Sequence, residues 1–171
     1  MFRTLRSGWR AALAAALALS ALPAAAQQAD PRLAEAMAIC LDHYPDLSGA
    51  RHAALTAGFR SEGRWSGMDL YSAYRRDLLA GYVGGREPLC VFGLDGLRDE
   101  AAVTAAQAAL AQRFGTELVR LGPSGDGEYI EGWVAAGPSG GILVGVHRQT
   151  TFDGYWRGSL ISVEPYKAPA P

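Results

Sequence analysis

The sequence predicts a single-domain α+β fold in which helices cover an antiparallel sheet with a C-terminal three-stranded meander. Apolar residues first recur at helical spacing and later alternate at strand spacing, with glycine-rich turns between the predicted strands. The prediction depends on a helix after Asp30-Pro31, the strand pair LLAGYV and PLCVFGL, and three final segments, EYIEGWVAA, GILVGVHRQT and GYWRGSLISVEP.

Residues 1–26 have the three parts of a signal peptide. A basic start precedes an apolar run over residues 11–22, and small residues follow up to Ala26. A membrane-spanning helix needs roughly 20 apolar residues, so this run is too short to be an anchor. We expect cleavage after Ala26 and a periplasmic or secreted protein without membrane insertion. The basic residues are Arg3, Arg6 and Arg10.

The remaining chain has the length of one domain, expected over residues 27–166, with a disordered tail over 167–171. The full chain has 16 Lys plus Arg and 17 Asp plus Glu. Because the signal peptide contains arginines and no acids, the mature protein is the more acidic part. Phosphate binding needs a concentrated basic surface, so we expect no nucleic-acid partner.

The first helix has clear signals at both ends. Asp30 can cap it, Pro31 suits its first position, and Pro45 ends it. Ser48 is expected to cap a second, short helix that runs to Ala57 and is ended by Gly58. The apolar face of the first helix consists of Leu33, Met37, Cys40 and Tyr44.

Strands are expected over residues 59–65, 78–83 and 88–94, the last two joined by a Gly-Gly turn. Residues 67–77 fit either a helical or an extended conformation. A helix from Leu97 or Asp99 to Phe114 should lie across the sheet, because its apolar residues form one stripe. That stripe consists of Val103, Ala106, Leu110 and Phe114.

Cys40 and Cys90 are the two cysteines of the chain. In an oxidising compartment an even pair predicts a disulfide. Both cysteines have apolar neighbours in predicted elements, so we expect the bond to tie the first helix to the strand PLCVFGL.

The segments AICLDHYPDL, AALTAGF and CVFGL resemble a group of small exported bacterial proteins with a cysteine-bearing N-terminal helix and a later C-V-F strand. The resemblance covers residues 33–114. It implies the disulfide and the topology, and it implies no activity.

Two motifs suggest a metal site or a catalytic nucleophile, but a purely structural role fits the residues of both motifs better. Cys40, Asp42 and His43 lie close together in sequence, yet a metal site needs three or four ligands and the cysteine is assigned to a disulfide. We expect no metal and no cofactor. Ser139 lies in a G-x-S-x-G match, but a strand rather than a helix is expected after it, which favours a hairpin tip.

Aromatic and polar residues gather in the final predicted strands, and Tyr129, Glu131 and Trp133 are expected to share one face of the first of them. They form a candidate surface for a peptide, glycan or protein, because Trp, Tyr and Arg supply contact area at low entropic cost. The alternative, which the sequence favours, is that the aromatics lie beneath the helix over 97–114 or at sheet edges. The candidate binding residues are Tyr129, Trp133, Tyr155, Trp156 and Arg157.

The sequence therefore predicts an exported, non-catalytic domain that binds a protein or cell-envelope component. No nucleophile, base and orienting group can be named together from the sequence. The alternative is a small periplasmic hydrolase with paired carboxylates, for which Glu128 and Glu131 are candidates. Two carboxylates facing each other in a closed cleft beside His147 would favour that alternative.

Overall fold

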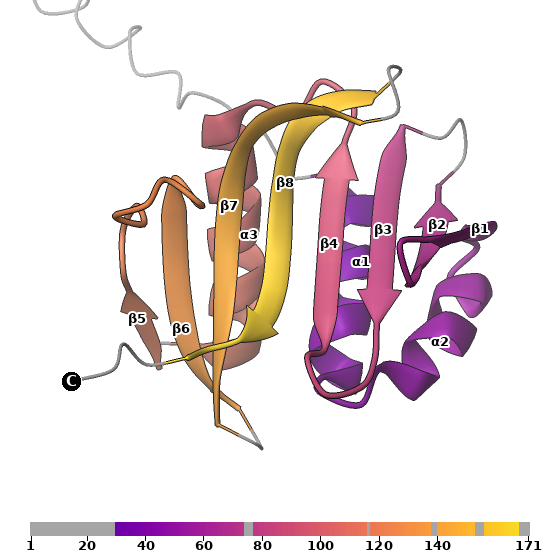
Figure 1. Cartoon of the computed structure of the whole chain (residues 1–171), viewed down its shortest axis with the longest axis horizontal. Helices are drawn as coiled ribbons and strands as arrows, with labels where there is room; N and C mark the ends of the chain where they lie inside the picture. Colours follow the sequence, from indigo (N-terminus) through magenta and orange to yellow (C-terminus); the bar gives the residue numbers. More distant parts are fainter. Residues whose placement is uncertain (1–29, 74–76, 116, 138–139, 153–155, 168–171) are drawn as a thin grey trace, which may run out of the picture.

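The computed structural model describes residues 30–73, 77–115, 117–137, 140–152 and 156–167. In this part of the chain an eight-stranded antiparallel sheet packs against α-helices, which confirms the predicted α+β class (Figure 1). The helices are α1 (Pro31–His43), α2 (Ala50–Thr56) and α3 (Asp99–Phe114), with a 3-10 turn η1 (Leu47–Gly49) before α2. The strands are β1 (Arg60–Trp65), β2 (Met68–Ser72), β3 (Leu78–Val83), β4 (Leu89–Leu94), β5 (Leu118–Arg120), β6 (Glu131–Gly137), β7 (Gly140–Phe152) and β8 (Trp156–Pro165).

The strand order is β1-β2-β3-β4-β8-β7-β6-β5. Each half of the domain is a helical segment followed by a four-stranded meander, and the two halves join where β4 pairs with β8. The topology therefore repeats although the sequence has no evident internal repeat. The predicted C-terminal meander is confirmed as β6, β7 and β8.

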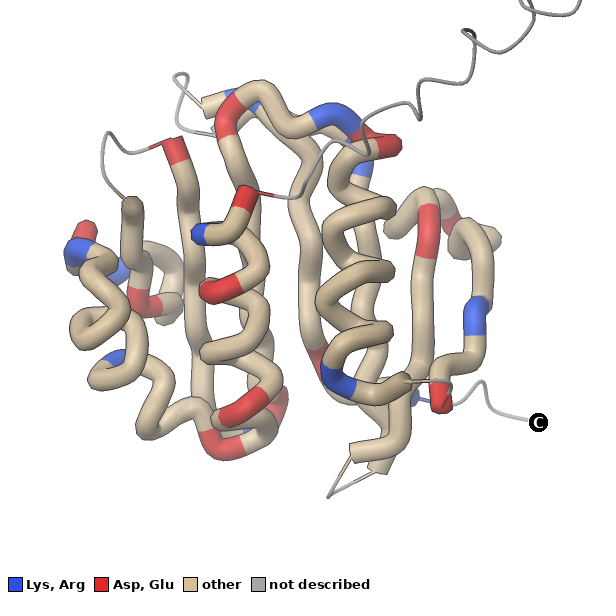
Figure 2. Tube along the Cα trace, turned by 180° about the vertical axis from the view of Figure 1, so that it is seen from behind, with Lys and Arg blue, Asp and Glu red and all other residues tan. Residues whose placement is uncertain are grey.

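The two faces of the sheet differ because the described helices cover only one of them, the helix face; we call the other the open face. Figure 2 shows α1 and α3 side by side across that helix face. Cys90 points to the helix face, since it is bonded to Cys40 of α1. Alternation along β4 then turns Val91 to the open face, and its ladder partner Ser162 shares that face.

The core lies between the sheet and the helices. Its fully buried members come from both halves, so a single core supports the whole domain. They include Leu33, Met37, Leu78, Phe92, Leu110, Val144, Val146, Ile161 and Val163. No described helix is long and apolar enough to cross a bilayer.

Two local predictions need correction. The cap before the second helical segment is Asp46, whose carboxylate accepts from the Ser48 amide at 3.2 Å, so Ser48 lies inside the turn. The short edge strand β5 was not predicted from the sequence. The ambiguous segment is extended at β2, and Asp30 caps α1 as predicted, accepting from the Arg32 amide at 2.9 Å.

The predicted leader over residues 1–26 and the predicted tail beyond Lys167 lie outside the described residues, as do Ser139 and Tyr155. Lys167, the first residue of the predicted tail, donates from its ammonium to Glu87 at 2.9 Å.

The predicted disulfide is present between Cys40 of α1 and Cys90 of β4, with the two Cα atoms 6.3 Å apart. Both cysteines are fully buried. The bond fixes the first helix on the centre of the sheet, 50 residues away in sequence.

We expect replacement of Cys40 or Cys90 by serine to lower the free energy of unfolding by about 4 kcal/mol, the chain-entropy value for a loop of this length. Urea unfolding of the oxidised protein measures the loss. The double variant should lose no more than either single variant, and a reducing agent should destabilise the wild type only. Two thiols that react in unfolded, unreduced protein would contradict the bond.

Candidate functional site

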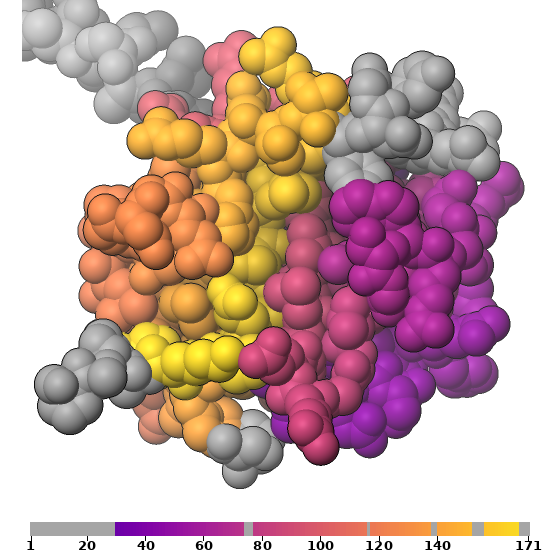
Figure 3. Space-filling view, in the orientation of Figure 1, coloured from indigo at the N-terminus to yellow at the C-terminus, as the bar shows by residue number. Residues whose placement is uncertain are grey.

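A hollow of about 630 Å³ opens on the uncovered face of the sheet. Three segments surround it: the β3–β4 turn, the loop between β5 and β6, and the end of β8. In the space-filling view the β5–β6 loop stands over this face and the end of β8 meets the β3–β4 turn (Figure 3). The volume lies within the range of pockets that hold small ligands or side chains.

The charges of this hollow are mainly negative. Carboxylates come from all three surrounding segments, and the single basic side chain of the lining, Lys167, is already paired with Glu87. We call this site the acidic hollow. Its charged lining residues are Glu87, Asp126, Glu128, Glu164 and Lys167, and its apolar and aromatic walls include Leu89, Tyr129, Leu143 and Tyr166.

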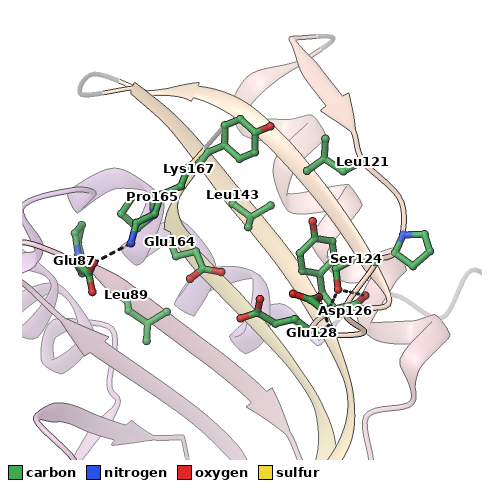
Figure 4. Close-up of a pocket in the computed structure, with 15 residues that line it drawn as sticks. Glu87, Leu89, Leu121, Ser124, Asp126, Glu128, Leu143, Glu164, Pro165 and Lys167 are labelled. Atoms are coloured by element: carbon green, nitrogen blue, oxygen red, sulfur yellow. Dashed lines mark hydrogen bonds and ion pairs between the residues drawn. The ribbon is translucent and has the colours of Figure 1, made fainter. Parts of the chain in front are cut away.

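Glu164 lies at the floor of the acidic hollow because it pairs with Leu143 across β7 and β8 on the open face. Its carboxyl is half-buried, and burial raises its pKa above the usual range. The negative charge of Glu128 raises the pKa further, while His147 and Lys167 oppose the shift. Figure 4 shows the Glu128 and Glu164 carboxylates beside each other in the hollow.

Tyr129 forms one wall by lying flat on the sheet. A Cβ added to Gly132 would come within 2.6 Å of the Tyr129 ring, so only glycine leaves room for the ring. Ser124 fixes the backbone of Tyr129, because its hydroxyl accepts from the Tyr129 amide at 2.9 Å. A strand glycine and a loop serine thus position this wall.

His147 ties the β5–β6 loop to the sheet. Its Nδ1 lies 2.7 Å from the Glu128 carbonyl oxygen, and its Nε2 lies 2.8 Å from the Ser162 hydroxyl. With Nδ1 protonated, the ring donates to the carbonyl and accepts from the serine. The bridge holds Glu128 at the edge of the hollow.

The Ser162 hydroxyl, the His147 ring and the Glu128 carbonyl are arranged like the nucleophile, the base and the orienting group of a catalytic triad. Ser162 is only 5% exposed, however, and neither Ser162 nor His147 lines the acidic hollow. A substrate has no access to the hydroxyl in this arrangement, so the bridge is structural.

The predicted Cys40, Asp42 and His43 cluster separates in space. Cys40 is in the disulfide, and Asp42 pairs with Arg113 of α3 at 3.2 Å. Among the residues that the structure describes, no group of three His, Cys, Asp or Glu side chains is placed to hold a metal ion.

The predicted aromatic surface divides between the two faces. Trp133 is 4% exposed in the core on the helix face, and Trp156 is 7% exposed on the open face, where its ring covers Gly93. Neither tryptophan belongs to an exposed surface, and Trp133 is buried on the helix face as the favoured alternative predicts. Arg157 is exposed, and Tyr129 is the predicted residue that lines the acidic hollow.

The expected alternation of Tyr129 with Trp133 fails because Tyr129 lies before β6 begins at Glu131. Glu131 itself faces the helix side, where it forms an ion pair with Arg120 that lowers the Glu131 pKa. Glu128 and Glu131 therefore do not face each other. Glu164, which the sequence analysis did not single out, is the partner of Glu128.

Comparison with protein-family models, with curated proteins and with solved structures finds no match to this chain.

We expect Gly132→Ala to destabilise the domain by about 1–3 kcal/mol, since the added methyl group overlaps the Tyr129 ring. The same change made together with Tyr129→Ala should cost less, which a double-mutant cycle of urea unfolding measures. Gly125→Ala is the matched control, because no atom lies within 4 Å of its added Cβ. Equal costs in both backgrounds would show that Tyr129 does not lie on Gly132.

Glu164→Gln should stabilise the protein at neutral pH. The raised pKa means that the folded state disfavours the ionised carboxylate, so stability falls as pH rises through that pKa. The variant lacks this loss, and its advantage should disappear below pH 4. Urea unfolding at pH 4 and 7.5 measures the difference.

Glu87→Gln is the control of opposite sign, because pairing with Lys167 lowers the Glu87 pKa. Removal of the Glu87 carboxylate should not stabilise the protein at any pH. A Glu164→Gln variant that is less stable than the wild type at pH 7.5 would contradict the assigned environment of Glu164.

Proposed function

We propose that this protein is an exported, non-catalytic domain that binds a protein or a cell-envelope component through the open face of its sheet. The acidic hollow carries the proposal, because it is a pocket-sized depression on the face that no described helix covers. The leader over residues 1–26 and the Cys40–Cys90 disulfide support an oxidising compartment outside the cytoplasm.

The chemistry around the hollow supports binding rather than catalysis. Ser124, the serine of the lining, accepts from the Tyr129 amide, and Ser162 and His147, which do not line the hollow, are joined in the bridge that anchors the loop. The backbone amides of β6, β7 and β8 beneath the hollow are used in ladder pairing.

The alternative function, a small periplasmic hydrolase, has one observation in its favour. Glu128 and Glu164 are close enough to interact, and Glu164 has a raised pKa. Environments that separate the pKa values of two carboxyls are typical of an acid and a base in glycoside hydrolysis. The hollow is open rather than closed, which favours binding. Turnover of peptidoglycan that Glu164→Gln abolishes would favour the hydrolase.

A steric block tests the proposed function. Gly125 lines the hollow and has open space around it, so Gly125→Trp should fill the hollow without straining the fold or changing its charge. The mature protein, immobilised, should capture an envelope component that Gly125→Trp loses. Gln107→Trp, on the exposed side of α3, should retain it. Absence of any captured component, or its retention by Gly125→Trp, would contradict the proposal.

A further inference from the structure

A second, smaller hollow of about 110 Å³ lies on the same open face. All of its lining residues are apolar, and we call it the apolar hollow. Cavities of about 150 Å³ accept a benzene ring, so this volume suits one apolar side chain. Its lining includes Trp65, Met68, Leu79, Val91 and Leu160, and Trp65 is 52% exposed.

The two hollows adjoin, because the same strands line both. Leu89 of β4 borders the acidic hollow, and Val91, two residues further along the same face, borders the apolar one. On β8, Glu164 borders the acidic hollow and Leu160 borders the apolar hollow. At about 3.4 Å per residue, these separations are roughly 7 and 14 Å. An extended chain covers that span in two to four residues.

The charges of the acidic hollow complement a basic group. Its lining contains four carboxylates and one ammonium, which is paired with Glu87. A cation placed beside Glu128 and Glu164 would relieve the repulsion between these carboxylates and favour the ionised form of Glu164. Tyr129 and Tyr166 offer aromatic surface to the stem of a lysine or arginine side chain.

We infer that the open face docks an extended segment of a partner protein that places a lysine or arginine in the acidic hollow and an apolar side chain in the apolar hollow. The inference rests on the proposed function and names the chemistry of its partner. The basic residue stands two to four positions from the apolar one. Complementary charge selects the segment, and burial of the apolar anchor adds affinity.

A random library of 12-residue peptides displayed on phage, selected on the mature protein, tests this inference without a known partner. Selected sequences should contain Lys or Arg two to four positions from an aliphatic or aromatic residue. Calorimetry with the most enriched sequence, made as a synthetic peptide, then measures its affinity for each variant.

The double variant Glu128→Gln/Glu164→Gln should bind this peptide at least tenfold more weakly, because two charge-assisted contacts are lost. Glu100→Gln, an exposed acid on α3, is the matched control and should bind as the wild type does. Trp65→Ala should weaken binding severalfold, whereas Leu55→Ala, an exposed apolar residue of α2, should not.

Three results would overturn the inference. One is a selection that yields no basic enrichment. Another is spermidine binding as tightly as the peptide, which would make the ligand a free amine. The third is an envelope component that no longer binds Gly125→Trp but still binds Glu128→Gln/Glu164→Gln. That result would support the proposed function and show that the partner is not recognised through a basic group.

Discussion

The antiparallel pairing of β4 with β8 is the constraint on which the rest of the structure depends. It joins two four-stranded meanders into one sheet and sets Cys90 opposite Val163 on the helix face. Because side chains alternate, a slip of one residue between these strands would either turn Cys90 away from Cys40 or turn Val163 to the open face. The disulfide therefore reinforces the register that the apolar pattern already favours. The same register brings Leu89 and Glu164 to the open face.

Two strand glycines explain how Trp156 and Tyr129 pack against the sheet face that no described helix covers. Gly93 lies beneath the Trp156 ring and Gly132 beneath the Tyr129 ring, so each ring packs flat on backbone rather than standing in solvent. Glycine inside a strand is unfavourable by itself, and here the burial of an aromatic ring compensates. Side chains of the sheet itself thus cover part of the open face, and Tyr129 also forms a wall of the acidic hollow.

Local signals in the sequence predicted much of the fold. The stripe of Leu33, Met37 and Cys40 defined α1, and turn glycines marked the hairpins. Segments with weak local signals were predicted poorly: β5 is three residues long, and Ser48 and Asp46 are both good caps. Tyr129 was placed on the wrong face because the alternation was extended to a residue before β6 begins. Alternation assigns a side chain to a face of the sheet only when its residue lies inside the strand.

The acidic hollow could not be predicted, because its residues come from three distant segments and meet only through the register of the sheet. Glu128 and Glu164 are 36 positions apart in sequence, and no local pattern indicates that they meet. A sequence selected for stability alone would not place Glu164 half-buried beside Glu128, where its ionisation is disfavoured. Residues that lower the stability of the folded state in this way are expected at functional sites. The unfavourable placement of Glu164 therefore supports binding at the hollow, since a basic ligand would turn the repulsion between the two carboxylates into attraction.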